Sequence, residues 1–200
     1  LPAPVERIVA AREDLRRELA AGLEDQLWNV YQTGRPAPPY RYEAGAAGER
    51  ALRNLCLGYL VCLERDIYRN ACFQQFQHAD NMTDVQAALT QLVHLDEPVR
   101  EKALQAFYDR WQNNPLVIDK WFMLQAQSRH PGTLENVQRL LTHPSFSWTN
   151  PNRVRSLIGS FAVGNPSAFH HASGAGYRWL SQVVERLDPI NPQTAARLVA

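Results

Sequence analysis

The stretch NPNRVRSLIGSF, Asn150 to Phe161, places two arginines directly before an apolar run. A guanidinium group forms a bidentate pair with a carboxylate, so either arginine could form a carboxylate-binding site. Arg153 and Arg155 are two residues apart, which separates them by about 200° around a helix axis. They cannot share one face, so one can point to solvent while the other meets a groove. Ordinary surface charge remains the alternative, because spacing alone does not decide it.

The histidines form no recognisable catalytic or metal-binding pattern. None of them belongs to an HExxH motif, so this sequence encodes no zinc hydrolase site of that type. His170 and His171 are adjacent and cannot face the same way on a helix, so we interpret them as part of a loop or helix end. The six histidines are His78, His94, His130, His143, His170 and His171.

Other chemically capable residues also favour structural roles. The cysteines show neither CxxC nor Cys/His metal spacing, and we interpret them as buried free thiols. The glycines of SGAGY, Ser173 to Tyr177, follow no strand, so a helix-entry turn is preferred to a phosphate loop. The tryptophans are scattered without a basic stripe, which favours core packing. These residues are Cys56, Cys62 and Cys72, and Trp28, Trp111, Trp121, Trp148 and Trp179.

The overall charge and hydrophobicity narrow the possible partners and location. Lys and Arg number 21 against 20 Asp and Glu, so the net charge of +1 gives no general electrostatic basis for binding nucleic acid or an anionic membrane. No apolar run approaches the roughly 20 residues that span a bilayer, and no signal peptide is evident. We therefore expect a cytoplasmic protein. A start at Leu1 and a stop inside an apparent helix suggest a fragment of a longer chain.

The hydrophobic pattern is helical along the whole chain. Leucines three or four residues apart predict one long amphipathic helix within residues 1–32. The stretch TGRPAPPY within residues 33–48 predicts a Pro/Gly linker. Residues 49–200 then predict helical hairpins. Two helices, Glu49 to Arg65 and Asp66 to Gln77, are expected to turn inward the side chains of Leu52, Leu55, Leu60, Leu63, Ile67, Phe73 and Phe76.

Asparagines mark the expected helix starts in the second half of the chain. Each of four Asn-Pro pairs combines an N-cap residue with a proline at the first helical position, and Asn81 and Thr133 mark further starts. No segment alternates at period two. The sequence therefore predicts a single all-α domain over residues 1–200, an irregular HEAT/armadillo-like α-solenoid of about ten or eleven short antiparallel helices. The pairs begin at Asn114, Asn150, Asn165 and Asn191.

Several blocks of the sequence resemble the C-terminal helical domain of bacterial aminopeptidase N, in the gluzincin family of zinc alanyl aminopeptidases. The blocks are NMTDVQAAL from Asn81, NPLVIDKWFMLQA from Asn114, HPSFSWTNPNRVRSLIGSFAVGNPSAFH from His143 and NPQTAARL from Asn191. ALRNLCLGYL from Ala51 is also similar to the family. The resemblance is strongest from Asn81 to Leu198.

The resemblance implies a non-catalytic domain of a peptide-cleaving hydrolase. The catalytic domain of the same polypeptide would hold the one zinc and the HExxH motif, and this domain would close over the active-site cavity and limit access to short peptides. By the family's motifs, the cavity-lining residues are Arg155, Gln193 and Arg197, with Arg153 outside or in a structural pair. The alternative is a free-standing α-solenoid adaptor that binds a protein partner on its concave face.

Overall fold

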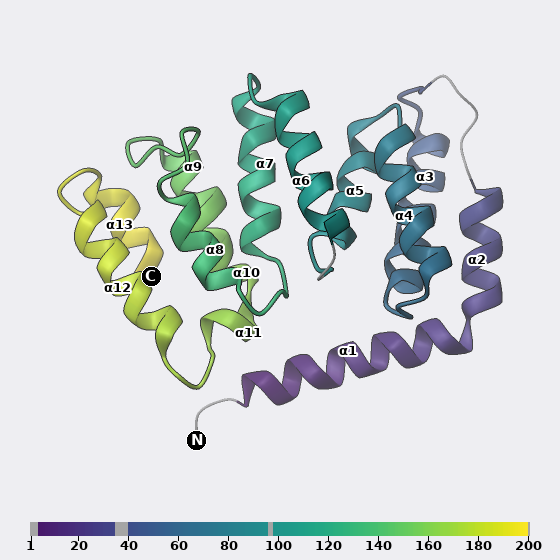
Figure 1. Ribbon diagram of the computed structural model, residues 1–200, viewed down its shortest axis with the longest axis horizontal. Helices are drawn as coiled ribbons and strands as arrows, with labels where there is room; N and C mark the ends of the chain where they lie inside the picture. Colours follow the sequence, from purple (N-terminus) through teal and green to yellow (C-terminus); the bar gives the residue numbers. More distant parts are fainter. Residues whose placement is uncertain (1–3, 35–39, 96–97, 200) are drawn as a thin grey trace. The chain divides into compact units, whose positions relative to one another are not determined.

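The computed structural model describes residues 4–34, 40–95 and 98–199. Over these residues the chain is helical without strands (Figure 1), which confirms the all-α solenoid prediction. Counting the continuous segment from Pro151 to Gly164 as one, the described part contains 12 helices, slightly more than predicted. The chain divides into two compact units, Ala10–Ala103 and the combination of Leu1–Val9 with Leu104–Ala200. The extent of a single domain over residues 1–200 stays a prediction.

The unit Ala10–Ala103 is built from helices that pack on their neighbours in the chain. Helices α3, α4 and α5 contact one another, and α2 packs along α3 (Figure 1). Leu57, Leu60, Leu89 and Leu92 are fully buried among them. Helices α1 and α6 each cross the boundary of the unit. The bounds are α1 Val5–Gly22, α2 Glu24–Thr33, α3 Ala44–Val61, α4 Asp66–His78, α5 Met82–Leu92 and α6 Pro98–Trp111.

Two boundaries in this unit differ from the sequence prediction. The helix expected over residues 1–32 is divided at Leu23, whose φ of −116° and ψ of 16° leave the helical range. Gly22 precedes this break, and glycine is the non-proline residue that a helix interior holds least well. Helix α3 begins at Ala44, before the expected Glu49. Residues 35–39, the proline-rich part of the predicted linker, lie outside the described residues.

Some leucines and one isoleucine do not occupy the core positions that the hydrophobic pattern indicated. On α3 the buried stripe passes through Leu57 and Leu60, and the two misassigned leucines lie away from it. Only part of each apolar pattern is therefore used for packing within the described residues. The exposed side chains are Leu15 at 60%, Leu19 at 42%, Leu23 at 46%, Leu52 at 52%, Leu55 at 56% and Ile67 at 53%.

The second unit surrounds an aromatic core. Phe122 and Phe161 are fully buried, and the Nε1 of the buried Trp121 donates to the Leu104 carbonyl at 3.0 Å. Helix α7 packs on α8 and on the segment α9–η1–α10, and α12 packs on α13 (Figure 1). The bounds are α7 Pro115–Ala126, α8 Thr133–Leu140, α9 Pro151–Val154, η1 Arg155–Gly159, α10 Ser160–Gly164, α11 Pro166–Phe169, α12 Ala175–Leu187 and α13 Pro192–Val199.

The predicted Asn-Pro helix starts are confirmed. Helices α7, α9, α11 and α13 each begin at the proline of one pair. In each case the asparagine Oδ1 accepts a hydrogen bond from a backbone N–H in the first turn, with N–O distances between 2.9 and 3.4 Å. These bonds satisfy amides that a helix leaves without an internal partner. Local sequence therefore fixes where the helices that carry the candidate site begin.

The glycines of SGAGY also have the predicted structural role. Gly174 adopts a left-handed φ of 68° and is the N-cap of α12. At Gly176 a Cβ atom would lie 2.4 Å from the Phe169 carbonyl oxygen, so only glycine permits this approach of α12 to α11. The segment is a helix entry. No helix within the described part of the chain is both long and apolar enough to cross a membrane.

Candidate functional site

Arg153 is a buried structural residue of helix α9. Its side chain is 6% exposed, and its Nε lies 2.8 Å from Asp119 Oδ1 on α7. The Nη1 donates to the Ser145 carbonyl at 2.8 Å, and the guanidinium lies 5.1 Å from the centroid of the Phe122 ring. Burial of a charge is tolerated when it is paired and hydrogen-bonded in this way. Arg153 therefore belongs to a structural pair. This is one of the two positions, outside or in a structural pair, that the family's motif implied for it.

Arg155, two residues later, points away from the core. It is exposed, and its Nη2 donates to Asn152 Oδ1 within the same segment. Arg155 opens η1, a turn of π-helix that ends at Gly159. Such turns are rare and frequently occur at functional sites, because they shift the side chains that follow relative to a regular helix. Within the described residues the guanidinium is held by this local contact alone, so a ligand can reach it.

Gln193 and Arg197 lie on one face of α13. Both are exposed, whereas Thr194 and Ala195 between them are buried. The Asn191 cap holds the start of the helix through a 2.9 Å bond from the Thr194 N–H. Residues four apart on a helix are neighbours on its surface, so the amide and the guanidinium can act on the same ligand.

Gly159 brings the end of η1 close to α13. A Cβ atom at Gly159 would lie 3.9 Å from both Arg155 Cβ and Leu198 Cδ2. Arg155 and Leu198, the residue after Arg197, therefore both lie close to Gly159. The segments η1 and α13 meet around this glycine. No hydrogen bond or ion pair joins the side chains of Arg155, Gln193 and Arg197 within the described residues. Their role in lining a cavity stays a prediction.

The cysteines and the histidine pair are not placed for catalysis. Cys56 and Cys72 are buried and Cys62 is half-buried, and all three are free thiols. Burial raises the pKa of the Cys72 thiol to about 12, which keeps it protonated and unreactive at neutral pH. His170 and His171 lie at the end of α11 and in the following turn, where their Nδ1 atoms contact Tyr177 Oη and Ser173 Oγ.

His143 is a feature that the sequence did not single out. It packs against the rings of Tyr108, Trp121 and Phe122, with centroid distances from 5.0 to 5.9 Å. Burial and the nearby Arg153 lower its pKa below the usual value. The signal in the sequence is weak, because the three aromatic partners come from α6 and α7, whereas His143 lies in the loop after α8. His143 is therefore a half-buried residue of the aromatic cluster whose neutral form is favoured.

No group of three or more His, Cys, Asp or Glu side chains able to hold a metal occurs among the described residues. A zinc ion needs at least three such protein ligands at one point. The described residues therefore offer no such site, and the resemblance places the zinc in a separate catalytic domain.

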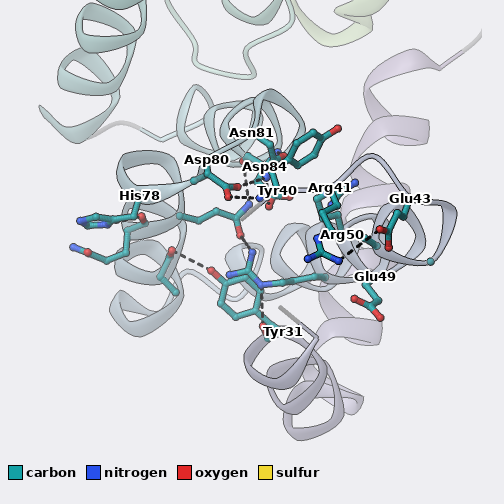
Figure 2. Close-up of a pocket in the computed structure, with 17 residues that line it drawn as sticks. Tyr31, Tyr40, Arg41, Glu43, Glu49, Arg50, His78, Asp80, Asn81 and Asp84 are labelled. Atoms are coloured by element: carbon teal, nitrogen blue, oxygen red, sulfur yellow. Dashed lines mark hydrogen bonds and ion pairs between the residues drawn. The ribbon is translucent and has the colours of Figure 1, made fainter. Parts of the chain in front are cut away.

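A polar cavity of about 740 Å³ lies in the unit Ala10–Ala103 (Figure 2). It is bounded by α2, α3, α4 and α5 and by the segment from Tyr40. On one wall Arg53 donates from Nη1 to Gln75 Oε1 at 2.7 Å and from Nε to the Tyr31 carbonyl at 3.1 Å. The Gln75 amide in turn donates to the Asp84 carbonyl at 3.0 Å. This wall is a satisfied hydrogen-bond network that holds the three helices α3, α4 and α5.

The sequence analysis did not predict this cavity. Arg50, Arg53 and Asn54 are three or four residues apart, so they share a face of α3, and that spacing was the available signal. Their partners Gln75 and Asp84 lie on other helices. Only the folded chain brings the five polar residues together.

Comparisons with known proteins decide the family of this chain. Residues 2–200 match the model described as "Domain of unknown function (DUF3458_C) ARM repeats". The chain belongs to the DUF3458_C ARM-repeat family. Armadillo repeats are helical units that stack into a solenoid, in agreement with the all-α architecture within each unit.

Named relatives of this DUF3458_C chain are aminopeptidases. It is 44% identical to Aminopeptidase N of Escherichia coli over 192 residues, which cover 96% of the chain. It is 42% identical to Aminopeptidase N of Caulobacter vibrioides over 190 residues, which cover 95% of the chain. These matches confirm the resemblance to the helical domain of bacterial aminopeptidase N. The chain spans about 22% of the length of each relative.

A solved structure is also similar to this DUF3458_C chain. The crystal structure of Legionella pneumophila aminopeptidase A in complex with aspartic acid matches with a TM-score of 0.87 and 30% sequence identity. The match covers 96% of this chain and 24% of that one. The helical arrangement is therefore shared with one part of a much longer aminopeptidase.

Proposed function

We propose that this chain is the non-catalytic C-terminal domain of a zinc-dependent aminopeptidase N that removes N-terminal residues from peptides. The observation that carries the proposal is 44% identity over 96% of the chain to a relative named Aminopeptidase N. The remainder of the protein supplies the zinc and the catalytic groups. The helical domain covers the active-site cavity, restricts access to short peptides and helps to position them.

The proposed partners follow from this placement. They are the catalytic domain of the same polypeptide and short peptide substrates, in the cytoplasm, without nucleic acid or membrane. The exposed leucines of α1, at 42% or more of their surface, support an interface with another part of the protein, because solvent-exposed apolar side chains favour burial. The near-neutral charge supports the absence of a nucleic-acid partner.

Arg155, Gln193 and Arg197 form the proposed cavity wall. Arg155 binds the carboxylate at the distal end of a peptide, and the exposed amide and guanidinium on α13 add donors on the same side. Support comes from the exposure of all three side chains and from the approach of η1 to α13 at Gly159. Arg153 takes no part, because its guanidinium is buried, forms an ion pair with Asp119 and donates to the Ser145 carbonyl.

Replacement of Arg155 by Ala in the full-length enzyme tests this role. We expect the KM for dipeptides and tripeptides to rise about five- to tenfold, which corresponds to a loss of about 1 kcal/mol from one partly exposed charge-assisted bond. The KM for an alanine amide substrate without a carboxylate should change less than about twofold. The measurement is steady-state kinetics with both substrate types.

Arg178→Ala is the matched control, because Arg178 is an exposed arginine on α12 whose Nη1 donates to the Ser173 carbonyl. It should leave both KM values unchanged. Equal effects of Arg155→Ala on the peptides and on the amide substrate would contradict the carboxylate role. Absence of peptidase activity in the wild-type full-length protein would contradict the proposed function itself and would leave a helical adaptor as the better interpretation.

A further inference from the structure

Arg50 is a buried cation without an ionic partner in the cavity of the unit Ala10–Ala103. Only 4% of the residue is exposed, and it lines the cavity (Figure 2). Its guanidinium lies 4.7 Å from the centroid of the Tyr40 ring. No hydrogen bond or ion pair of its side chain occurs within residues 4–34, 40–95 and 98–199. Stacking on an aromatic face suits a guanidinium but leaves its five N–H donors unused.

The neighbouring arginines of the cavity differ from Arg50 in this respect. Arg53 is held by Gln75 and by the Tyr31 carbonyl, and Arg41 lies 3.9 Å from Glu43. Tyr40 covers one face of the Arg50 guanidinium, while its nitrogen atoms stay accessible from the cavity, so a ligand group can reach them. Arg50 therefore marks the position for an anionic group.

The surrounding charges select the kind of anion. The cavity is lined by three arginines, Arg41, Arg50 and Arg53, and by four carboxylates, Glu43, Glu49, Asp80 and Asp84. This balance disfavours a doubly charged phosphate, which needs a clear excess of cations. A carboxylate carries a single charge and matches the planar fork of a guanidinium. The ligand group that faces Arg50 is therefore a carboxylate.

One carboxylate of the cavity is also unpaired. Asp84 accepts from the amides of Asn54 and Asn81 at 2.8 and 3.0 Å. Glu49 is exposed, lines the same cavity beside Arg50, and has no such partner within the described residues. A ligand with a carboxylate and an ammonium group would pair with both Arg50 and Glu49. The amides of Gln74 and Asn81 provide further hydrogen-bonding groups at the wall.

We propose that this cavity is a binding site for a small zwitterion of the amino acid class, with its carboxylate on Arg50 and its ammonium group on Glu49. The site uses residues of α3 and does not involve Arg155, Gln193 or Arg197. It does not depend on the proposed aminopeptidase function, because its ligand is recognised by charge and not hydrolysed.

Three matched probes test the two charges separately in the full-length protein. β-Alanine carries both groups, propionate carries only the carboxylate, and n-propylamine carries only the ammonium group. We expect β-alanine to bind about tenfold more tightly than propionate, and propylamine not to bind measurably. Saturation-transfer NMR titrations measure the three dissociation constants. A wild-type protein that binds none of the probes, or binds propylamine as tightly as β-alanine, would overturn the proposal.

Variants connect the binding to the two residues. Arg50→Met keeps the aliphatic stem against Tyr40 and should weaken β-alanine and propionate by about tenfold or more. Glu49→Gln should weaken β-alanine alone. Arg17 is an exposed arginine of α1 that pairs with Asp14 at 3.4 Å, and Arg17→Met should leave all three affinities unchanged. Unchanged β-alanine affinity in Arg50→Met would refute the site.

A second substitution covers the case in which Arg50→Met does not fold. Arg50→Lys keeps the charge but loses the two-pronged geometry, so it should fold and still bind both carboxylates several-fold more weakly. Circular dichroism establishes that each variant is folded before the titrations. Wild-type affinity in Arg50→Lys, with phosphate competing as well as propionate, would show a nonspecific cation and not a carboxylate site.

Discussion

Replacing Arg153 by Met should destabilise the second unit far more than the same change at Arg155. Methionine keeps a flexible apolar stem against the Phe122 ring but removes the partner of Asp119 and the donor to the Ser145 carbonyl. Asp119 would remain as a largely buried carboxylate, because its side chain is only 18% exposed. The two arginines lie two residues apart in the same segment, so Arg155→Met is a close control.

The expected magnitude follows from these contacts. Removing one member of a buried pair costs about 3–5 kcal/mol, and the residual exposure of Asp119 places this case near the lower end. An unsatisfied Ser145 carbonyl adds about 1 kcal/mol. We therefore expect the free energy of unfolding to fall by about 3–4 kcal/mol for Arg153→Met, against less than about 0.5 kcal/mol for Arg155→Met, which is exposed.

Hydrogen exchange measured by mass spectrometry can read this change locally in the full-length protein. Peptides from α7 and from the segment Pro151–Gly164 should lose protection in Arg153→Met but not in Arg155→Met. In the double variant with Asp119→Asn the loss should be less than the sum of the single losses by at least about 1 kcal/mol. The structural role of the pair would be refuted if the free energy of opening in Arg153→Met lay within about 1 kcal/mol of wild type. It would also be refuted if the losses of the two single variants added fully in the double variant.

Two further predictions concern groups with shifted pKa values. The lowered pKa of His143 means that its neutral form is favoured in the folded state, so its contribution to stability is present above the ordinary pKa of 6.5 and is lost as the pH falls. His143→Gln should reduce the acid sensitivity of the second unit, and a pH series of urea titrations that shows the same slope in both proteins would contradict this. The pKa of Cys72, raised to about 12, predicts that a thiol reagent at neutral pH labels the half-buried Cys62 first and Cys72 only on unfolding. Equal labelling rates, measured by mass spectrometry of the peptides, would show that Cys72 is accessible.

Helix starts could be predicted from the sequence because they are local. An Asn-Pro pair contains both the acceptor for the first amides and the residue whose φ suits the first turn, so Pro115 and Pro192 begin helices whatever surrounds them. The break at Leu23 was missed because one glycine in an amphipathic pattern does not determine whether a helix continues. The exposed Leu52 and Leu55 show the same limit, since the apolar pattern does not say which neighbour covers it.

The environment of each arginine side chain could be determined only from the folded structure. Spacing showed that Arg153 and Arg155 face different directions, but the partner that draws one of them inward, Asp119, is on α7. The cavity of the first unit was missed for the same reason, because Gln75 and Asp84 reach Arg53 and Asn54 only after three helices have packed. Arg155 was chosen as a candidate from the resemblance to a known family, and not from any contact of its side chain.

Three arginines of this chain show how burial and partners together separate structural from binding roles. Arg153 is buried and its charge is matched by Asp119, so the fold itself accounts for it. Arg155 is exposed and, within the described residues, contacts a neighbour in its own segment, so its charge costs little when free and stays open to the peptide carboxylate proposed for it. Arg50 is buried and unmatched by the described residues, and neither argument accounts for it. Its guanidinium keeps its charge at physiological pH and its nitrogen atoms are accessible from the cavity, so the proposed ligand carboxylate can pair with it there.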